Sequence, residues 1–93
     1  MSEKRALALH PQDNLAVAAQ DIGPGDPVRV EFKDGATRQV KAVEAVPFGF
    51  KIALVDIAQG GELLKYGQVI GRASQPIAAG QQIHIHNAQG QRA

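Results

Sequence analysis

Short runs of alternating apolar and polar residues dominate the chain. The clearest covers residues 28–32, Val-Arg-Val-Glu-Phe, whose period of two predicts a strand with one buried face. Similar runs, bounded by Gly, Pro, Asn and Asp, predict further strands at 6–10, 15–20, 37–46 (partly loop), 51–57, 63–66, 68–73 and 82–86. No run has the length and 3.6-residue period of an amphipathic helix. The pattern predicts about seven short strands with Gly- and Pro-rich turns, a small all-β barrel or sandwich.

One short phrase occurs three times: an Ile, two residues, a Gly, two residues and an aliphatic residue. The copies lie 35 and then 20 residues apart, so they do not form a repeat of fixed period. Each Ile is expected to be a buried anchor, and each Gly to take a positive φ that turns the chain into a strand. The anchors are Ile22, Ile57 and Ile77; the glycines are Gly25, Gly60 and Gly80; the strands are expected to start at Val28, Leu63 and Ile83.

Size and charge narrow the classes of protein to which the chain can belong. The 93 residues are expected to form one domain, residues 1–93, with residues 1–4 and 88–93 frayed. A net charge of +1 and an aromatic content of 4% argue against nucleic acid and membrane surfaces as partners. The absence of cysteine excludes disulfides and thiolate metal sites. Because no apolar run suits a signal peptide or a membrane span, a cytoplasmic protein is expected.

Two histidines near the C-terminus are the first candidate site. In Ile83-His84-Ile85-His86, alternation would place both imidazoles on one face and both isoleucines in the core, with the histidine Cα atoms about 6.6 Å apart. Two imidazoles at that spacing can meet one divalent metal ion or one substrate carboxylate, and imidazole suits iron, manganese and zinc. The alternative is a pair of exposed polar residues on an edge strand.

A turn near the N-terminus is the second candidate. His10-Pro11-Gln12-Asp13-Asn14 has the composition of a turn whose Asp and Asn bond their own backbone, and this structural interpretation stays open. A functional role requires His10 to meet His84 and His86 in space. We expect such a three-histidine cluster to face a pocket or a partner chain.

Two aromatic segments complete the candidates. Phe48-Gly49-Phe50-Lys51 would line a pocket and aim Lys51 at a substrate carboxylate, or else form a hydrophobic plug with a solvated lysine. Tyr66 would be a proton donor, or else an anchored and mostly buried side chain. Serine and threonine are scarce, the carboxylates form no evident pair, and the phosphate-binding glycine patterns are missing. The chain therefore has no self-sufficient active site.

Taken together, the motifs in residues 6–91 have the order found in one family. They are His-x-x-Asp-Asn (10–14), Asp-Ile-x-x-Gly (21–25 and 56–60), Pro-x-Gly-x-Lys-x-Ala-Leu (47–54), Lys-Tyr-Gly-x-x-Ile-Gly (65–71) and His-x-His-Asn (84–87). The chain resembles the SAF domain of the altronate/galactarate dehydratase family, which forms a small subunit or an N-terminal domain. It is also similar to the small subunit of sulfolactate sulfo-lyase.

This resemblance implies a fold, a reaction and a partner. It implies a β-clip fold and a place beside a large catalytic chain that eliminates water or sulfite from hydroxy acids. A divalent metal, iron or manganese, would be shared with the large chain and would not bind tightly to this chain alone. The candidate substrate-binding residues on these motifs are His10, Asp13, Asn14, Lys51, His84, His86 and Asn87, and the candidate metal ligands are His84 and His86.

Two positions depart from the pattern of the family. Phe50 stands where the family has His in Gly-His-Lys, so one imidazole is missing, and Pro76 stands where the last repeat usually has Asp. The leading hypothesis is the small subunit of a sugar-acid hydro-lyase, inactive by itself. The alternatives are a stand-alone SAF-type ligand-binding or assembly module and a protein that binds metal through three histidines. Self-association into a homo-oligomer is also left open.

Overall fold

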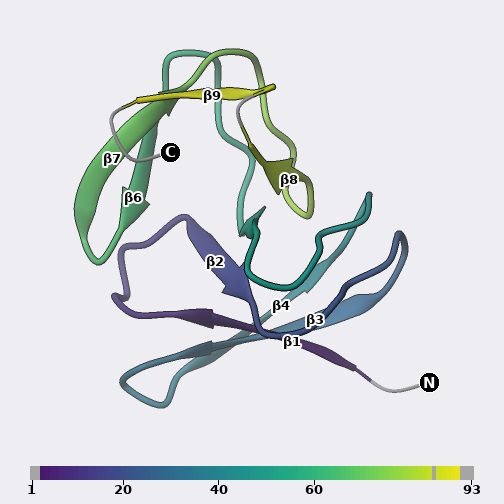
Figure 1. Cartoon of the computed structure of the whole chain (residues 1–93). Helices are drawn as coiled ribbons and strands as arrows, with labels where there is room; N and C mark the ends of the chain where they lie inside the picture. The colour runs from purple at the N-terminus through teal and green to yellow at the C-terminus, as the bar shows by residue number, and fades with distance from the viewer. Residues whose placement is uncertain (1–2, 85, 91–93) are drawn as a thin grey trace.

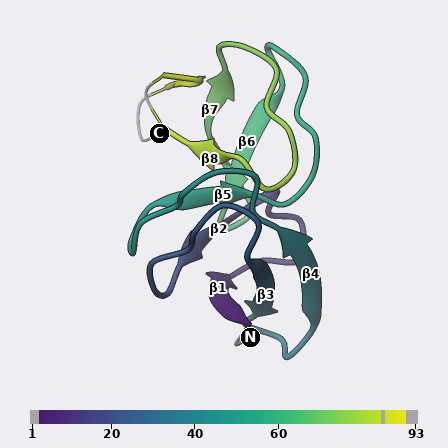
Figure 2. The ribbon, with the colours of Figure 1, turned by 90° about the vertical axis from the view of Figure 1, so that its right-hand side faces the viewer.

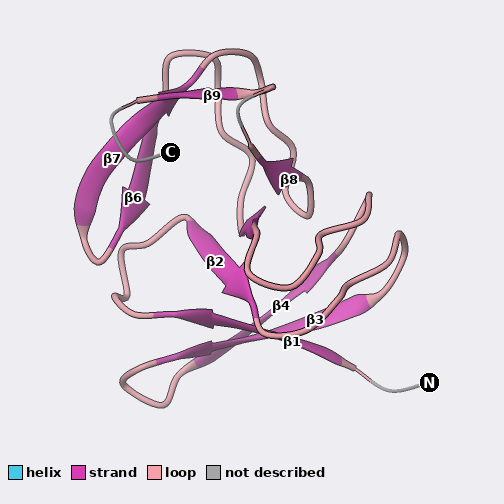
Figure 3. Cartoon of the chain, viewed as in Figure 1, coloured by secondary structure: helices cyan, strands magenta, loops and turns pink. Residues whose placement is uncertain are grey.

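The computed structural model describes residues 3–84 and 86–90, which form two β-sheets. Within these residues there are nine strands and no helix, so none that could cross a membrane (Figures 1 and 3). The larger sheet has the order β4 (Thr37–Lys41), β3 (Pro27–Phe32), β1 (Lys4–Ala8), β2 (Leu15–Ala18), β5 (Lys51–Ala53), β8 (Gln82–Ile83). The smaller sheet has the order β6 (Glu62–Lys65), β7 (Gln68–Ala73), β9 (Ala88–Gln89). The all-β prediction is confirmed.

Some predicted boundaries are wrong, and local hydrogen bonds explain why. β5 ends at Ala53, and not at Ile57, because its partner β2 begins at Leu15, opposite Ala53, and Asn14 before it bonds to β6. β8 ends at Ile83, and not at His86, because a turn closed by Asn87 follows it. Ala88 and Gln89, expected in the frayed tail, form β9 and pair with the end of β7.

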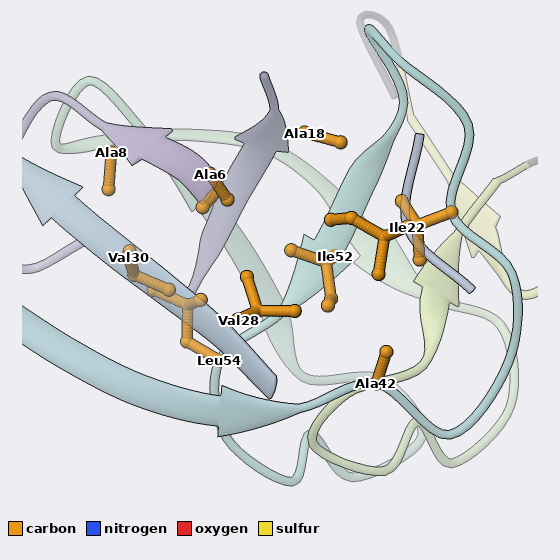
Figure 4. Close-up of a cluster of buried hydrophobic side chains, with 11 residues drawn as sticks. Ala6, Ala8, Ala18, Ile22, Val28, Val30, Ala42, Ile52 and Leu54 are labelled. Carbon is orange, nitrogen blue, oxygen red and sulfur yellow. The ribbon is translucent and has the colours of Figure 1, made fainter. Parts of the chain in front are cut away.

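The two faces of the larger sheet pack into different cores. Small and branched residues from one face form the first core, with Ala6, Ala18, Val28, Val30 and Ile52 at most 1% exposed (Figure 4). On the opposite face, Leu15, Ala53 and Ile83 join residues of the smaller sheet in a second core. The smaller sheet lies over the β2–β5–β8 end of the larger one (Figures 1 and 2). It leaves the outer parts of β1 and β2 uncovered, and the candidate site lies there.

The repeated phrase anchors both halves of the chain. Ile22, Ile57 and Ile77 are at most 6% exposed, which confirms them as anchors. Gly25, Gly60 and Gly80 have φ of 83°, 82° and 87°, as predicted, and each following strand begins one residue earlier than expected. The structure adds a fourth copy, Val46-Pro47-Phe48-Gly49, with the glycine at φ 85°. The four copies form two bridged pairs, Ile22 with Val46 and Ile57 with Ile77.

The domain therefore contains two copies of one structural unit, each built on one bridged pair of phrases. The hairpin β3–β4 connects the first pair of phrases and the hairpin β6–β7 connects the second. In each pair, an aspartate preceding the first anchor accepts a bond from the third residue of the second phrase: Asp21 from the amide of Phe48 and Asp56 from that of Ala79, both at 2.9 Å. In each pair, the aspartate that accepts this bond precedes the first phrase. Pro76 precedes the second phrase of its pair, so an aspartate at that position is not needed for the bond.

Candidate functional site

The tip of the β6–β7 hairpin has an unusual backbone. Its two turn residues, Tyr66 and Gly67, have φ of 57° and 71°, and Tyr66 is the single non-glycine residue with positive φ in the described part of the chain. Two-residue turns with both φ positive favour Asn-Gly, because a side chain in the left-handed region costs about 1–2 kcal/mol. A tyrosine here is therefore strained and needs support from its surroundings.

Asp13 provides that support from the β1–β2 connection. Its side chain is buried, with the residue 4% exposed. Oδ2 accepts from the amide of Tyr66 at 3.0 Å and Oδ1 from the amide of Gly67 at 2.8 Å, while the amide of His10 donates to Oδ2 at 3.3 Å. Each such bond to a charged acceptor stabilises by about 1.5–3 kcal/mol. The carboxylate thus fastens the tip of the hairpin to the larger sheet.

Asn14 extends this attachment along β6. Its side-chain amide donates to the carbonyl of Glu62 at 2.8 Å, and its Oδ1 accepts from the amide of Leu64 at 2.9 Å. The side chain therefore replaces a strand neighbour at the edge of β6. The Asp and Asn expected in a self-contained turn bond mainly across to a distant hairpin, so both residues connect the two sheets.

His10 lies at the same tip. Its Nδ1 accepts from the amide of Gln12 at 3.1 Å, which assigns the proton of the neutral ring to Nε2. The edge of the ring lies over Gly67, where an added Cβ would be 2.9 Å from both Cδ2 and Nε2. Gly67 is thus required by the contact with His10 as well as by the turn.

Two lysines lie beside this tip. Lys51 is the strand partner of Val17 on β2, which in turn pairs with Leu7 on β1. Lys65 reaches the same face and lines a small hollow of about 20 Å³ with Leu7, Leu9, Leu15 and Val17 among its walls. Partial burial, and then the positive charge of Lys65, lower the pKa of Lys51 below its ordinary value of 10.5. The three ion pairs among the described residues involve neither lysine, so the pair is open to an anion.

The lowered pKa of Lys51 predicts a dependence of stability on pH. The folded state disfavours the ammonium form, so this cost is fully present below the folded pKa and disappears as pH rises toward 10.5. Lys51→Met is therefore expected to raise the melting temperature at pH 7, with the difference shrinking as pH rises toward 10.5. Thermal unfolding across this range tests the prediction. Lys33→Met, at an exposed turn, is the control, and an equal effect of both substitutions would contradict it.

The C-terminal histidines lie elsewhere and not on a strand. The amide of His84 donates to Oδ1 of Asn87 at 2.9 Å, and the amide of Asn87 donates to the carbonyl of His84 at 3.0 Å. This turn leaves both imidazoles exposed, with ring centroids 6.1 Å apart, and Phe50 packs against His84 at 5.3 Å. Ile83 is buried as predicted, and Ile85 lies outside the described residues. Asn87, 0% exposed, holds the turn through a second bond to the carbonyl of Gln82.

The predicted three-histidine cluster is wrong. His10 lies at the β6–β7 tip, whereas His84 and His86 lie between β8 and β9 (Figure 1). Across residues 3–84 and 86–90, no three His, Asp or Glu side chains are grouped so as to hold a metal ion. Phe50, which contacts His84, offers hydrocarbon where the family pattern has an imidazole. Two imidazoles are an incomplete donor set, so these described residues do not fit a metal site by themselves.

Sequence reasoning missed several features of the site. The structural alternative for Tyr66 was a mostly buried side chain, yet Tyr66 is 56% exposed. Phe48 and Phe50 are 68% and 37% exposed, so they form no hydrophobic plug. Lys65 precedes Tyr66 in the Lys-Tyr-Gly motif, yet the sequence suggested no role for it, and Leu7 and Leu9 carried no signal as site residues. The unusual placement of Tyr before Gly in a two-residue turn is the one clue the sequence offered.

Comparisons with known proteins agree on one group. The family model described as the altronate/galactarate dehydratase SAF domain matches residues 4–91. Altronate dehydratase from Escherichia coli is 42% identical over 81 residues, 87% of this chain and 15% of that protein. Altronate dehydratase from Bacillus subtilis is 38% identical over 89 residues, 90% of this chain and 16% of that protein. The (2R)-sulfolactate sulfo-lyase subunit alpha from Chromohalobacter salexigens is 38% identical over 56 residues, 60% of each chain.

Proposed function

Because the chain belongs to the altronate/galactarate dehydratase SAF domain family, we propose that it is the small component of a sugar-acid hydro-lyase and helps to form the substrate pocket beside a large catalytic chain. The chain covers only 15–16% of the two altronate dehydratases, so most of such an enzyme lies outside it. The sulfo-lyase relative, matched over 60% of both chains, is named as subunit alpha. That name supports a component that works beside another chain.

The observation that carries this proposal is the pair of adjacent lysines. Lys51 is the strand partner of Val17, and Lys65 lines a hollow with that same Val17, so the two ammonium groups reach one face; no described carboxylate forms an ion pair with either. A bound carboxylate would relieve the repulsion between the two ammonium groups and form charge-assisted hydrogen bonds. The substrates named for the relatives are acids, and each carries such a group. We assign the lysine pair to the substrate carboxylate.

The lysines would assist elimination through charge. Removing the proton from the carbon next to a carboxylate places negative charge near that carboxylate, and two nearby ammonium groups stabilise it. The described residues contain neither a paired carboxylate dyad nor a complete metal site for expulsion of hydroxide. We therefore place the base, and the iron or manganese ion of such an enzyme, on the large chain. His84 and His86 remain proposed substrate contacts, whereas Asn87 is buried and holds the turn that presents them.

The test is a reconstituted assay. The chain is co-expressed with a large catalytic chain of the same family and assayed on altronate, galactarate and sulfolactate. We expect no turnover from the 93-residue chain alone, and turnover from the complex. Lys51→Met together with Lys65→Met is expected to reduce kcat/KM by about 10- to 100-fold, the loss of one charge-assisted contact. The paired control is Lys33→Met with Lys41→Met, two exposed lysines of the β3–β4 hairpin.

Three outcomes would contradict the proposal. Turnover by the small chain alone would make it an enzyme by itself. Failure to associate with the large chain would favour the stand-alone SAF-type binding or assembly module. Unchanged kcat/KM in the double lysine variant of an active complex would remove the lysine pair from the site.

A further inference from the structure

The strained tyrosine at the β6–β7 tip has no structural reason to be tyrosine. Its backbone is held at φ 57° by the buried Asp13 carboxylate, while its side chain is 56% exposed. The ring contributes to neither core. In the described part of the chain, the ring contacts the cation of Lys65, whose Nζ lies 5.3 Å from the ring centroid. Asparagine would suit this backbone better, so the aromatic ring is kept at a cost to the domain.

The surroundings of the ring form a continuous patch of exposed apolar and cationic groups. Leu7 and Leu9 are 44% and 41% exposed and lie beside Lys65, and Val17 separates this group from Lys51. We call Leu7, Leu9, Val17, Lys65 and Tyr66 the tyrosine patch. It combines a central tyrosine with flanking aliphatic groups, and tyrosine is among the residue types enriched at protein interfaces and their hot spots.

We propose that the tyrosine patch is the surface on which the large catalytic chain docks, with Tyr66 as its anchor. This inference rests on the proposed function for the identity of the partner. The hollow beside Lys65 holds only about 20 Å³, too little for a sugar acid, so a small ligand alone leaves the patch exposed. The chain covers only 15–16% of the two altronate dehydratases, so the rest of such an enzyme offers a large surface that would cover the apolar groups and leave the lysines to the substrate carboxylate. Docking here would close the pocket over Lys51 and Lys65.

The test uses one substitution with two opposite expected effects. Tyr66→Asn is expected to raise the melting temperature of the free chain by about 4–8 °C, because Asn relieves the strain of the turn. The same change is expected to weaken association with the co-expressed large chain at least about tenfold in Kd, measured by calorimetry. The matched control is Val43→Asn, at a loop residue that is also 56% exposed, and it is expected to leave Kd unchanged.

The outcomes separate this inference from the proposed function. A complex that forms with unchanged Kd in Tyr66→Asn overturns the docking surface and leaves the proposed function standing. Absence of any complex in the unmodified chain overturns both. A melting temperature that falls in Tyr66→Asn overturns the argument from strain. Sedimentation of the free chain is also measured, because a dimer that dissociates in Tyr66→Asn would assign the patch to a second copy of this chain.

Discussion

Gly80→Ala is expected to destabilise the domain by about 3 kcal/mol or more, whereas Gly25→Ala should cost only about 1–2 kcal/mol. Both glycines have positive φ, 87° and 83°, so the cost of a left-handed backbone is shared. The two positions differ in the room that a Cβ atom would find. A Cβ on Gly80 would lie 2.0 Å from the carbonyl oxygen of Lys41, whereas nothing lies within 4 Å of a Cβ on Gly25.

This matched pair separates crowding from backbone conformation. Urea unfolding of both variants gives the two free energies of unfolding. Their difference measures how closely the phrase that begins at Ile77 packs on the end of β4. The amide of Val43 also donates to the carbonyl of Gly80 at 3.0 Å, so the backbone there has little freedom to move away. Equal destabilisation by the two substitutions would mean that, in solution, the backbone at Lys41 can move away from a Cβ atom at position 80.

Asp13→Ala is expected to cost about 3–5 kcal/mol, the range for breaking a buried network of charge-assisted bonds. Alanine would leave the amides of Tyr66 and Gly67 without their acceptor and would remove the support of the strained turn. The smaller sheet would then remain attached to the β1–β2 connection mainly through Asn14. Chemical unfolding measures the loss, and hydrogen exchange at the amides of Tyr66 and Gly67 localises it.

The control for Asp13 is another aspartate that accepts a backbone bond at the surface. Asp21 is exposed and accepts one such bond, from the amide of Phe48, so Asp21→Ala is expected to cost about 1 kcal/mol. Similar costs for the two substitutions would show that burial and the two additional backbone bonds add nothing at Asp13. They would also remove the explanation for how Tyr66 is held.

The sequence predicted the features that depend on neighbouring residues. Alternation in residues 28–32 identified β3, and the Ile-x-x-Gly phrases identified three anchors and three left-handed glycines correctly. The fourth phrase was missed because Val46 replaces Ile, although its backbone is the same. Local chemistry of this kind decides each element before the chain is assembled.

The features that sequence reasoning missed depend on pairs of distant residues. Asp13 bonds to Tyr66, 53 positions away, and no periodicity indicates such a contact. The alternation around His84 suggested a strand, but the buried side chain of Asn87 ends β8 with a turn. Lys51 and Lys65 come together only because β6 packs against β2, the strand that pairs with β5. Placing the site therefore required the tertiary structure, whereas the family pattern alone supplied its candidate residues.

The duplicated unit also has a practical consequence for engineering. Of its two hairpins, one ends at the fastened Tyr66-Gly67 tip, and the other ends at residues 33–36, all exposed, where an added Cβ on Gly35 meets nothing within 4 Å. Exposed turns with few tertiary bonds accept inserted peptides and labels best. A fluorophore or affinity tag placed between Asp34 and Gly35 would report on the chain while leaving Asp13, both lysines and the tyrosine patch unaltered.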